Sequence, residues 1–250
     1  MGKTIAIVNQ KGGVGKTTSC VNLAAALTAQ GAKVLVCDFD PQGNATSGFG
    51  LDKSRSPSVY DVILGDAPMP KAVVSTKWGD VVPANKALSG ATVELIALDR
   101  REYRLKDAIE EVKGSYDFIF IDCPPSLELL TLDGLCAADT LLVPVQCEYY
   151  ALEGLSDLLY TVRLAKQRLN PSLEMEGVLL TMYDGRTNLS LQVAEEVKRH
   201  FPGKVYASVI PRNVRLSEAP SHGKPVLAYD PWSRGTDAYK ALAEEVISRE

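Results

Sequence analysis

The feature that most constrains the fold is a glycine-rich loop set between an apolar run and a helical pattern. The loop runs from Gln10 to Thr18 and reads Q-K-G-G-V-G-K-T-T. The run from Thr4 to Val8 predicts a strand, and the pattern from Asn22 to Ala29 predicts a helix. A strand, a glycine loop and a helix in this order predict a site where backbone N–H groups and a helix N-terminus surround a phosphate.

Two side chains of the loop match this chemistry. We expect Lys16 to reach the β- and γ-phosphates of a nucleotide and Thr17 to offer its hydroxyl to Mg²⁺. The loop lacks the first glycine of the usual G-x-x-x-x-G-K-[ST] pattern and begins with a second lysine, Lys11. Two lysines around one glycine loop indicate a phosphate ligand that neutralises them. The predicted nucleotide-binding residues of the loop are Lys11, Gly12, Gly13, Val14, Gly15, Lys16, Thr17 and Thr18.

Apolar strand-like runs alternate with longer helical patterns along most of the 250 residues. Continuous apolar strands separated by helices predict an α/β fold with a doubly wound, mostly parallel sheet and helices on both faces. We expect a single domain over residues 1–250, with ligands at the carboxyl ends of the strands.

The sequence pattern also predicts where the other elements lie. The expected strands are 33–37, 80–83, 94–98, 116–121, 140–145, 176–182 and 205–210. The expected helices are 59–68, 101–112, 127–136, 152–169, 189–201 and 237–247. Residues 211–235 are expected to form a long polar loop because they are rich in Arg, Asn, Ser, Gly and Pro.

Acidic residues follow two of the predicted strands. The segment D-F-D-P-Q-G-N begins at Asp38 and contains Asp40, and the segment D-C-P-P-S begins at Asp122. A nucleotide site needs a group that orients the attacking water. A buried carboxylate such as Asp122 is costly without a cation, and Mg²⁺ held through water would compensate it. The alternative for Asp40 is a purely structural Asx-turn, because D-P-Q-G is also good turn chemistry.

The motifs K-G-G-V-G-K-T-T, D-F-D-P-Q-G-N and I-D-C-P-P together resemble the ParA/MinD superfamily of ATPases with a deviant Walker A loop. The resemblance implies the P-loop NTPase fold, a Rossmann-like three-layer arrangement, with ATP and Mg²⁺ as cofactors. It implies that Lys11, Lys16 and Asp40 are catalytic, with Lys11 crossing a dimer interface and Asp40 positioning water. It also implies a metal site made by Thr17, Asp40 and Asp122.

The C-terminal third looks like the Soj-type chromosomal ParA proteins. The matching stretches are T-M-Y-D-G-R-T-N at 181–188 and P-R-N-V-R-L-S-E-A-P-S-H-G-K-P at 211–225, so the resemblance covers nearly the whole chain. It implies a homodimer that forms on ATP binding, binds double-stranded DNA without sequence preference and hydrolyses ATP slowly. It further implies a ParB-like centromere-binding partner and a cytoplasmic, nucleoid-associated location.

The resemblance also suggests residues for base and DNA contacts. It places the adenine near Pro211 and Asn213. DNA binding without sequence preference requires cationic side chains on one face that touch phosphates, and the candidates are Arg186, Arg215 and Lys224. An ordinary solvated charged surface is the alternative. Further cations that could extend such a patch are Lys198, Arg199, Lys204 and Lys240.

Composition excludes some other classes. A net charge of -4 and a pI near 5.4 argue against a histone-like binder. The five cysteines form no C-x-x-C pair, which favours reduced thiols. No apolar run approaches the roughly 20 residues that span a bilayer. The first predicted strand begins at residue 4, which leaves no room for a signal peptide.

The main alternative is a MinD-like membrane-cycling ATPase of division-site placement, which would carry a basic amphipathic C-terminal helix. The apolar stripe of the last predicted helix, Tyr239, Leu242 and Val246, has an acidic polar face, so it fits core packing better and no membrane contact is expected. An iron-protein branch would need cluster cysteines in a glycine-rich loop. A metabolic kinase or ligase would need a substrate pocket, for which no insert is visible.

Overall fold

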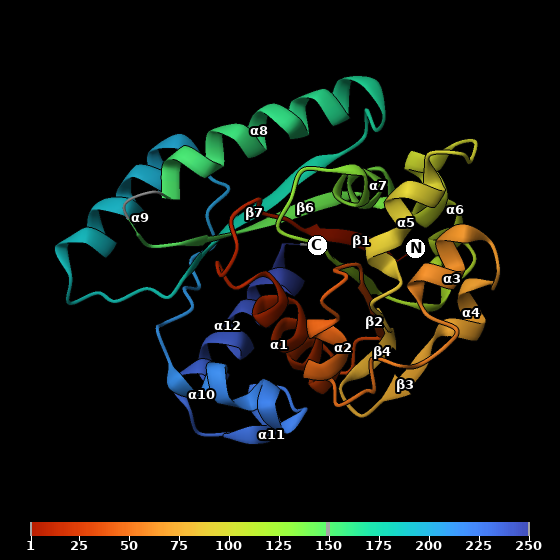
Figure 1. The fold of residues 1–250 in the computed structure, drawn as a ribbon. Coiled ribbons are helices and arrows are strands. Elements are labelled where there is room, and N and C mark those ends of the chain that lie inside the picture. The colour runs from red at the N-terminus through yellow and green to blue at the C-terminus, as the bar shows by residue number, and fades with distance from the viewer. Residues whose placement is uncertain (1, 149–150, 250) are drawn as a thin grey trace.

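A computed structural model describes residues 2–148 and 151–249, and within them the strands form one seven-stranded sheet in the order β3-β4-β2-β5-β1-β6-β7 (Figure 1). The strands are β1 (Lys3–Ile7), β2 (Val34–Asp38), β3 (Val74–Thr76), β4 (Gly79–Val82), β5 (Phe118–Asp122), β6 (Thr140–Gln146) and β7 (Glu174–Thr181). Every neighbouring pair is parallel except the edge pair β3 and β4. The predicted mostly parallel, doubly wound sheet is therefore confirmed.

Helices cover both faces of this sheet (Figure 1). They are α1 (Lys16–Ala29), α2 (Asn44–Gly48), α3 (Val59–Leu64), α4 (Met69–Ala72), α5 (Leu88–Leu95), α6 (Arg104–Glu110), α7 (Leu129–Ala137), α8 (Ala151–Arg168), α9 (Asn188–His200), α10 (Val214–Glu218), α11 (Val226–Tyr229) and α12 (Arg234–Ser248). Alternate side chains of β1 serve the two layers, because successive residues of a strand point to opposite faces. Ile5 and Ile7 join the core that contains Leu23 of α1, whereas Ala6 and Val8 join the other core.

Two of the expected strands are wrong. Residues 94–98 belong to the end of helix α5 and the turn after it, because Leu88, Ala91 and Leu95 recur at helical spacing and are all fully buried. Beside β7, residues 205–210 make only an isolated bridge, between Val178 and Val205.

The second error has a visible cause. In the segment 205–210, the backbone N–H groups of Ala207 and Ser208 donate to the Glu245 carboxylate, each at 2.8 Å, so the ladder with β7 is interrupted. The expected loop 211–235 also contains the short helices α10 and α11.

The sheet register gathers three of the predicted motifs at one edge. Asp122, the last residue of β5, lies opposite Ile7 of β1 and Asp38 of β2. The glycine loop follows β1 directly, so the loop and both acidic segments leave the sheet side by side. This edge is the carboxyl end of the parallel strands, where open α/β sheets hold their ligands.

Candidate nucleotide site

The conformation of the glycine loop is fixed by its backbone angles and by a side chain outside the motif. Gly13 and Gly15 have φ angles of +73° and +91°, values that disfavour any side chain. Asn9 Oδ1 accepts the Lys11 N–H at 3.0 Å, and Asn9 Nδ2 donates to the Pro144 carbonyl at 2.8 Å. The loop is thus tied to β6 before it enters α1, and no pattern in the sequence singled out Asn9 for this role.

Lys16 is buried at the start of α1, with only 6% of its surface exposed. Its ammonium group donates to the Lys11 carbonyl at 3.1 Å, inside the loop. Burial lowers the pKa of Lys16, while the nearby carboxylates of Asp122 and Asp40 raise it. The side chain is therefore a cation held among acids, and an anionic ligand would stabilise its charged form.

Asp122 is the most unusual group of the site. It is fully buried, and neither carboxylate oxygen forms a hydrogen bond of good geometry within the described ranges, although the Thr17 hydroxyl lies close enough to lower its pKa. Burial, reinforced by Asp38 and Asp40, raises the pKa of Asp122 well above its usual value, although Thr17 and Lys16 oppose the shift. A buried carboxylate with open oxygens beside a threonine hydroxyl fits a divalent cation that prefers oxygen ligands, such as Mg²⁺.

Asp38, which ends β2, and Asp40, two residues later, have different roles. Asp38 is fully buried and accepts both the N–H and the hydroxyl of Thr46 at 2.6 Å, so it fixes the start of α2. Burial raises its pKa to about 6, and the Thr46 bonds oppose the shift. Asp40 lines the cavity described next, and its Oδ1 accepts the Gln42 N–H at 2.9 Å. Asp40 therefore forms the Asx-turn and faces the site as well.

Two adjoining cavities occupy this edge. The first, of about 290 Å³, is lined by the loop together with Asp40 and Pro125. The second, of about 340 Å³, shares Gly15 and Thr18 with the first and contains Pro211 and Asn213. A larger cavity of about 490 Å³ lies between α9 and residues 201–209, and none of the predicted nucleotide-binding residues lines it. The two smaller cavities bring the predicted phosphate and base residues together.

Met182 separates the two cavities and was not predicted. It lines both of them and has a φ angle of +48°, in the left-handed region that a methionine rarely adopts. The preceding residue, Thr181, donates its hydroxyl to the Val14 carbonyl at 2.8 Å, which ties the end of β7 to the glycine loop. The sequence carries no signal for this position of Met182, because its positive φ value is visible only in the structure.

The candidate DNA-contact residues lie outside this site. Arg186 precedes α9 and Arg215 lies on α10, and both helices are on the left flank of the molecule in Figure 1. The Arg186 side chain is 90% exposed and forms two hydrogen bonds, of 2.9 and 2.8 Å, to the carboxylate of Asp184. Lys224 is exposed, and it forms no ion pair with any of the residues described.

Arg215 is held more tightly than Arg186. Its guanidinium pairs with Glu218 at 2.8 Å and with Asp230 at 3.1 Å. Both predicted arginines are therefore exposed but already neutralised by carboxylates of their own neighbourhood.

Comparison with known proteins identifies the family. The family described as "AAA domain" matches residues 2–175. The sporulation initiation inhibitor protein Soj of Bacillus subtilis is 59% identical over 251 residues, covering 99% of both chains. The chromosome-partitioning ATPase Soj of Treponema pallidum is 51% identical over 252 residues, covering 100% of this chain and 99% of the relative. The chain belongs to the Soj/ParA family of chromosome-partitioning ATPases.

A solved structure agrees with the assignment of the fold. Cobyrinic acid a,c-diamide synthase from Mycobacterium smegmatis, with a bound ATP analogue and magnesium, superimposes with a TM-score of 0.88 at 39% identity. The match covers 100% of this chain and 96% of that one. The family resemblance predicted from the motifs is confirmed, and so is the P-loop NTPase fold.

The last helix bears on the membrane alternative. The apolar stripe of α12, Tyr239, Leu242 and Val246, is at most 1% exposed and lies in the core that also contains Leu23 of α1. This stripe is unavailable to a lipid surface. Among the residues described, no helix is long and apolar enough to cross a membrane.

Proposed function

We propose that this chain is a DNA-segregation ATPase that binds ATP and Mg²⁺ in the two adjoining cavities. The observation that carries the proposal is the convergence of Lys16, Thr17 and Asp40 on one cavity, with the open carboxylate of Asp122 beside Lys16. Lys16 would exchange its bond to the Lys11 carbonyl for the β- and γ-phosphates. Thr17, Asp40 and Asp122 would hold Mg²⁺, directly or through water. Mg²⁺, when bound, neutralises charge that develops on the phosphates.

The second cavity suits the nucleoside. Pro211 offers an apolar surface against a base, and Asn213 offers an amide group. The Asn213 side-chain oxygen already accepts the Arg215 N–H at 2.8 Å, which leaves its NH₂ group to donate. We assign Pro211 and Asn213 to the base end of the site on this basis.

Hydrolysis would depend on Asp40. Its carboxylate lines the phosphate cavity and is fixed by the Gln42 N–H, so it can orient a water molecule toward the γ-phosphate. No arginine lines this cavity within the described residues, so intrinsic turnover should be slow. A ParB-like centromere-binding protein would supply the stimulation, which in other phosphoryl-transfer systems is about 10³–10⁵-fold.

ATP would also join two subunits, with Lys11 of each reaching the partner's nucleotide. The loop surface at Gly12 supports this arrangement, since Gly12 is exposed and a Cβ built there meets no atom within 4 Å. Gly12→Val should therefore fold and bind ATP but keep two subunits apart. Light scattering with ATP should show a monomer for the variant and a dimer for the parent, and a dimeric variant would contradict this geometry.

The dimer would bind double-stranded DNA through Arg186, Arg215 and Lys224. Pairing two subunits doubles the number of phosphate contacts, and affinity rises steeply with that number. The protein would then act on the nucleoid in the cytoplasm, releasing DNA once the γ-phosphate is lost and the segments around Asp40 and Asp122 relax.

The decisive experiment measures binding to a duplex of arbitrary sequence, with MgATP or MgADP, across a salt series. We expect binding that requires ATP and weakens steeply with salt. Lys16→Ala should not bind the duplex even with MgATP. Equal binding in both nucleotide states would contradict the proposal. Absence of DNA binding combined with ATP-dependent binding to anionic liposomes would favour the membrane-cycling alternative.

A further inference from the structure

Trp232 is exposed on the surface near the proposed DNA contacts. It lies in the turn between α11 and α12, and 91% of its surface is accessible, more than for any other large hydrophobic side chain in the part of the chain described. Val214, at the start of α10, is 64% exposed. An indole carries a large apolar surface with a polar N–H, and tryptophan is enriched at interaction sites for that reason.

The turn that carries Trp232 is fixed to Arg215. The backbone N–H of Trp232 donates to one oxygen of the Asp230 carboxylate at 3.2 Å, and the other oxygen accepts Arg215 Nε at 3.1 Å. Thr236 closes the same turn by donating its hydroxyl to the Asp230 carbonyl at 2.7 Å. One carboxylate therefore ties the backbone of the Trp232 turn to the guanidinium of Arg215.

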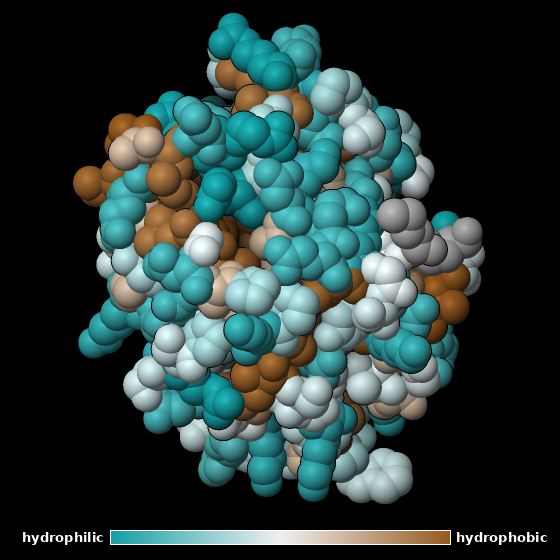
Figure 2. Space-filling model, turned by 90° about the vertical axis from the view of Figure 1, so that its right-hand side faces the viewer, coloured by the Kyte–Doolittle hydropathy of each residue, from teal (hydrophilic) through white to brown (hydrophobic). Residues whose placement is uncertain are grey.

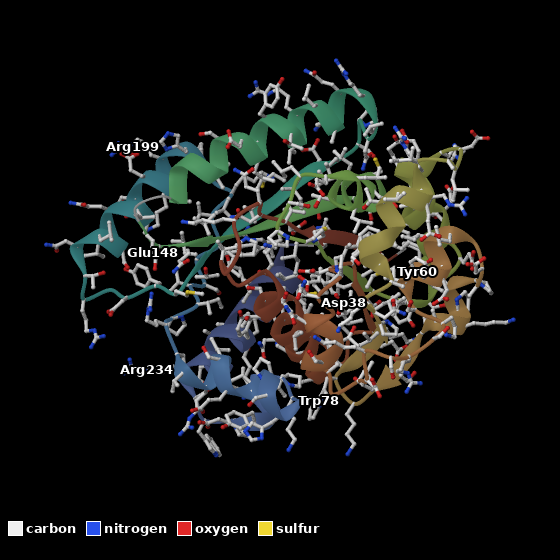
Figure 3. The ribbon with its side chains drawn as sticks, in the orientation of Figure 1. Asp38, Tyr60, Trp78, Glu148, Arg199 and Arg234 are labelled. Carbon is white, nitrogen blue, oxygen red and sulfur yellow. The ribbon has the colours of Figure 1, made fainter. Side chains whose placement is uncertain are left out.

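A second cation, Arg234, lies two residues after Trp232 in the sequence. Arg234 is exposed at the first position of α12, and Figure 3 shows it on the same flank as α10. An exposed aromatic side chain, in a turn that is tied to one arginine and followed by a second, matches a polyanion that also has apolar surface, which is the chemistry of a nucleic acid.

The local charge balance makes an additional contact useful. Arg215 is shared by Glu218 and Asp230, so its net attraction for a phosphate is weaker than that of an unpaired arginine. A contact that does not depend on charge would add affinity without adding sequence preference. An indole supplies such a contact at low entropic cost, because it has only two rotatable side-chain bonds.

We propose that Trp232 contacts the deoxyribose and base edges of double-stranded DNA whose phosphates are bound by Arg215. This rests on the DNA binding proposed above and extends it from ionic contacts to an apolar one. Side chains that enter a groove in this way contact sugar and base surfaces that every sequence presents.

Tryptophan fluorescence tests the contact directly. The chain has two tryptophans, and the other, Trp78, is half-buried in the β3–β4 connection. In Trp78→Phe, quenching by acrylamide reports Trp232 alone. With MgATP, a non-specific duplex should protect the indole, and the matched Trp232→Phe protein should show no change. Full quenching with DNA bound would overturn the proposal.

Affinity measurements separate an apolar contact from an ionic one. Trp232→Ala should weaken duplex binding about 5- to 150-fold, the range expected for losing one aromatic–base contact. The slope of log Kd against log salt should stay unchanged, because no cation is lost, whereas Arg215→Ala should make the slope shallower. ATP-driven dimerisation should be unchanged, and Trp232→Phe should recover most of the affinity.

The outcomes also distinguish this inference from the function on which it rests. Normal affinity of Trp232→Ala with ATP-dependent binding by the parent protein would overturn the Trp232 contact alone. Loss of dimerisation in Trp232→Ala would place the indole at a subunit interface and would likewise overturn it. Absence of ATP-dependent DNA binding by the parent protein would overturn both.

Discussion

The nucleotide edge, which is the carboxyl end of the parallel strands, and the flank that carries α9 and α10 differ in how their charged side chains are buried and paired. At the edge, Lys16 is 6% exposed and Asp122 is fully buried without a hydrogen bond of good geometry in the described structure. On the flank, the side chains of Arg186 and Arg215 are 90% and 47% exposed and already paired with nearby carboxylates. The edge has buried charged groups whose interactions a ligand must complete, whereas both arginines of the flank already have carboxylate partners.

This difference predicts how each region responds to change. A buried charge is costly to leave unpaired, so single substitutions at the edge should have large effects. Exposed paired arginines contribute little individually, so the flank should work only through the number of contacts that dimerisation brings together.

The largest effect on nucleotide binding is expected for Lys16→Ala. Charged hydrogen bonds contribute about 1.5–3 kcal/mol each, so losing one should weaken ATP binding about 10- to 150-fold. Titration calorimetry with MgATP measures this, with Lys71→Ala, an exposed lysine on α4, as the matched control. The thermal unfolding temperature of Lys16→Ala should also be measured without nucleotide. Lys16 lies near Asp122 and Asp40, so its removal also changes the charge balance of the folded protein. Unchanged ATP affinity would remove Lys16 from the site.

Asp40→Ala should leave ATP binding largely intact and slow hydrolysis. A positioned acid–base group contributes about 10²–10⁴-fold to rate, so turnover should fall by that order and the ATP dimer should persist on DNA. Asp40→Asn is the informative control, because an amide oxygen can still accept the Gln42 N–H and preserve the Asx-turn. Slow turnover in both variants supports a chemical role. Normal turnover in Asp40→Asn would reduce Asp40 to a turn residue.

The sequence was informative where chemistry requires fixed spacing. Lys16 and Thr17 follow a glycine loop, and Asp122 ends an apolar strand, so the sequence alone predicts that these residues share one site. Continuous apolar strands also predicted the parallel sheet. Where tertiary contacts decide, prediction failed. The 205–210 segment reads as a strand, but the distant Glu245 takes its N–H groups, and no local pattern reveals this.

The flank was predicted by resemblance, and its physical limits emerged only from the structure. Arg215 was chosen for its charge, while its pairing with Asp230, fifteen positions later along the chain, depends on the turn between α11 and α12. Met182 and Asn9 were missed for the same reason, since a backbone angle and a link to β6 define them.

An intermediate effect is expected for Arg215→Glu. The new carboxylate would stand beside Glu218 and Asp230, forming an acidic cluster that repels DNA phosphates. Each lost phosphate contact lowers the salt slope by about 0.9, so a dimer should lose about 1.8. ATP-driven dimerisation should be normal. Lys71→Glu makes the same change in charge on α4, at the opposite side of the molecule in Figure 1. An equal loss in both variants would mean that overall charge, not this position, governs binding.

The smallest effect should run in the opposite direction. Arg186 lowers the pKa of Asp184 to about 2 through their paired hydrogen bonds, so the pair is fully ionised at neutral pH. In Asp184→Asn the amide oxygen can still accept the backbone N–H of Arg186, a hydrogen bond of 3.1 Å in the parent protein. The Arg186 guanidinium, however, loses its counter-charge. DNA affinity should therefore rise about 1.5- to 5-fold, in line with the modest strength of an exposed ion pair.

The double variant Asp184→Asn/Arg186→Ala tests whether the released Arg186 guanidinium causes this gain in DNA affinity. If the gain comes from a released guanidinium, removing that guanidinium must abolish it. A gain that survives in the double variant would come from the lost negative charge alone, and Arg186 would then be part of a solvated surface. Affinity measured at two salt concentrations suffices, because a released phosphate contact also steepens the salt dependence. If the gain is lost in the double variant, the DNA affinity of the flank is limited by its own carboxylates and not by a shortage of cations.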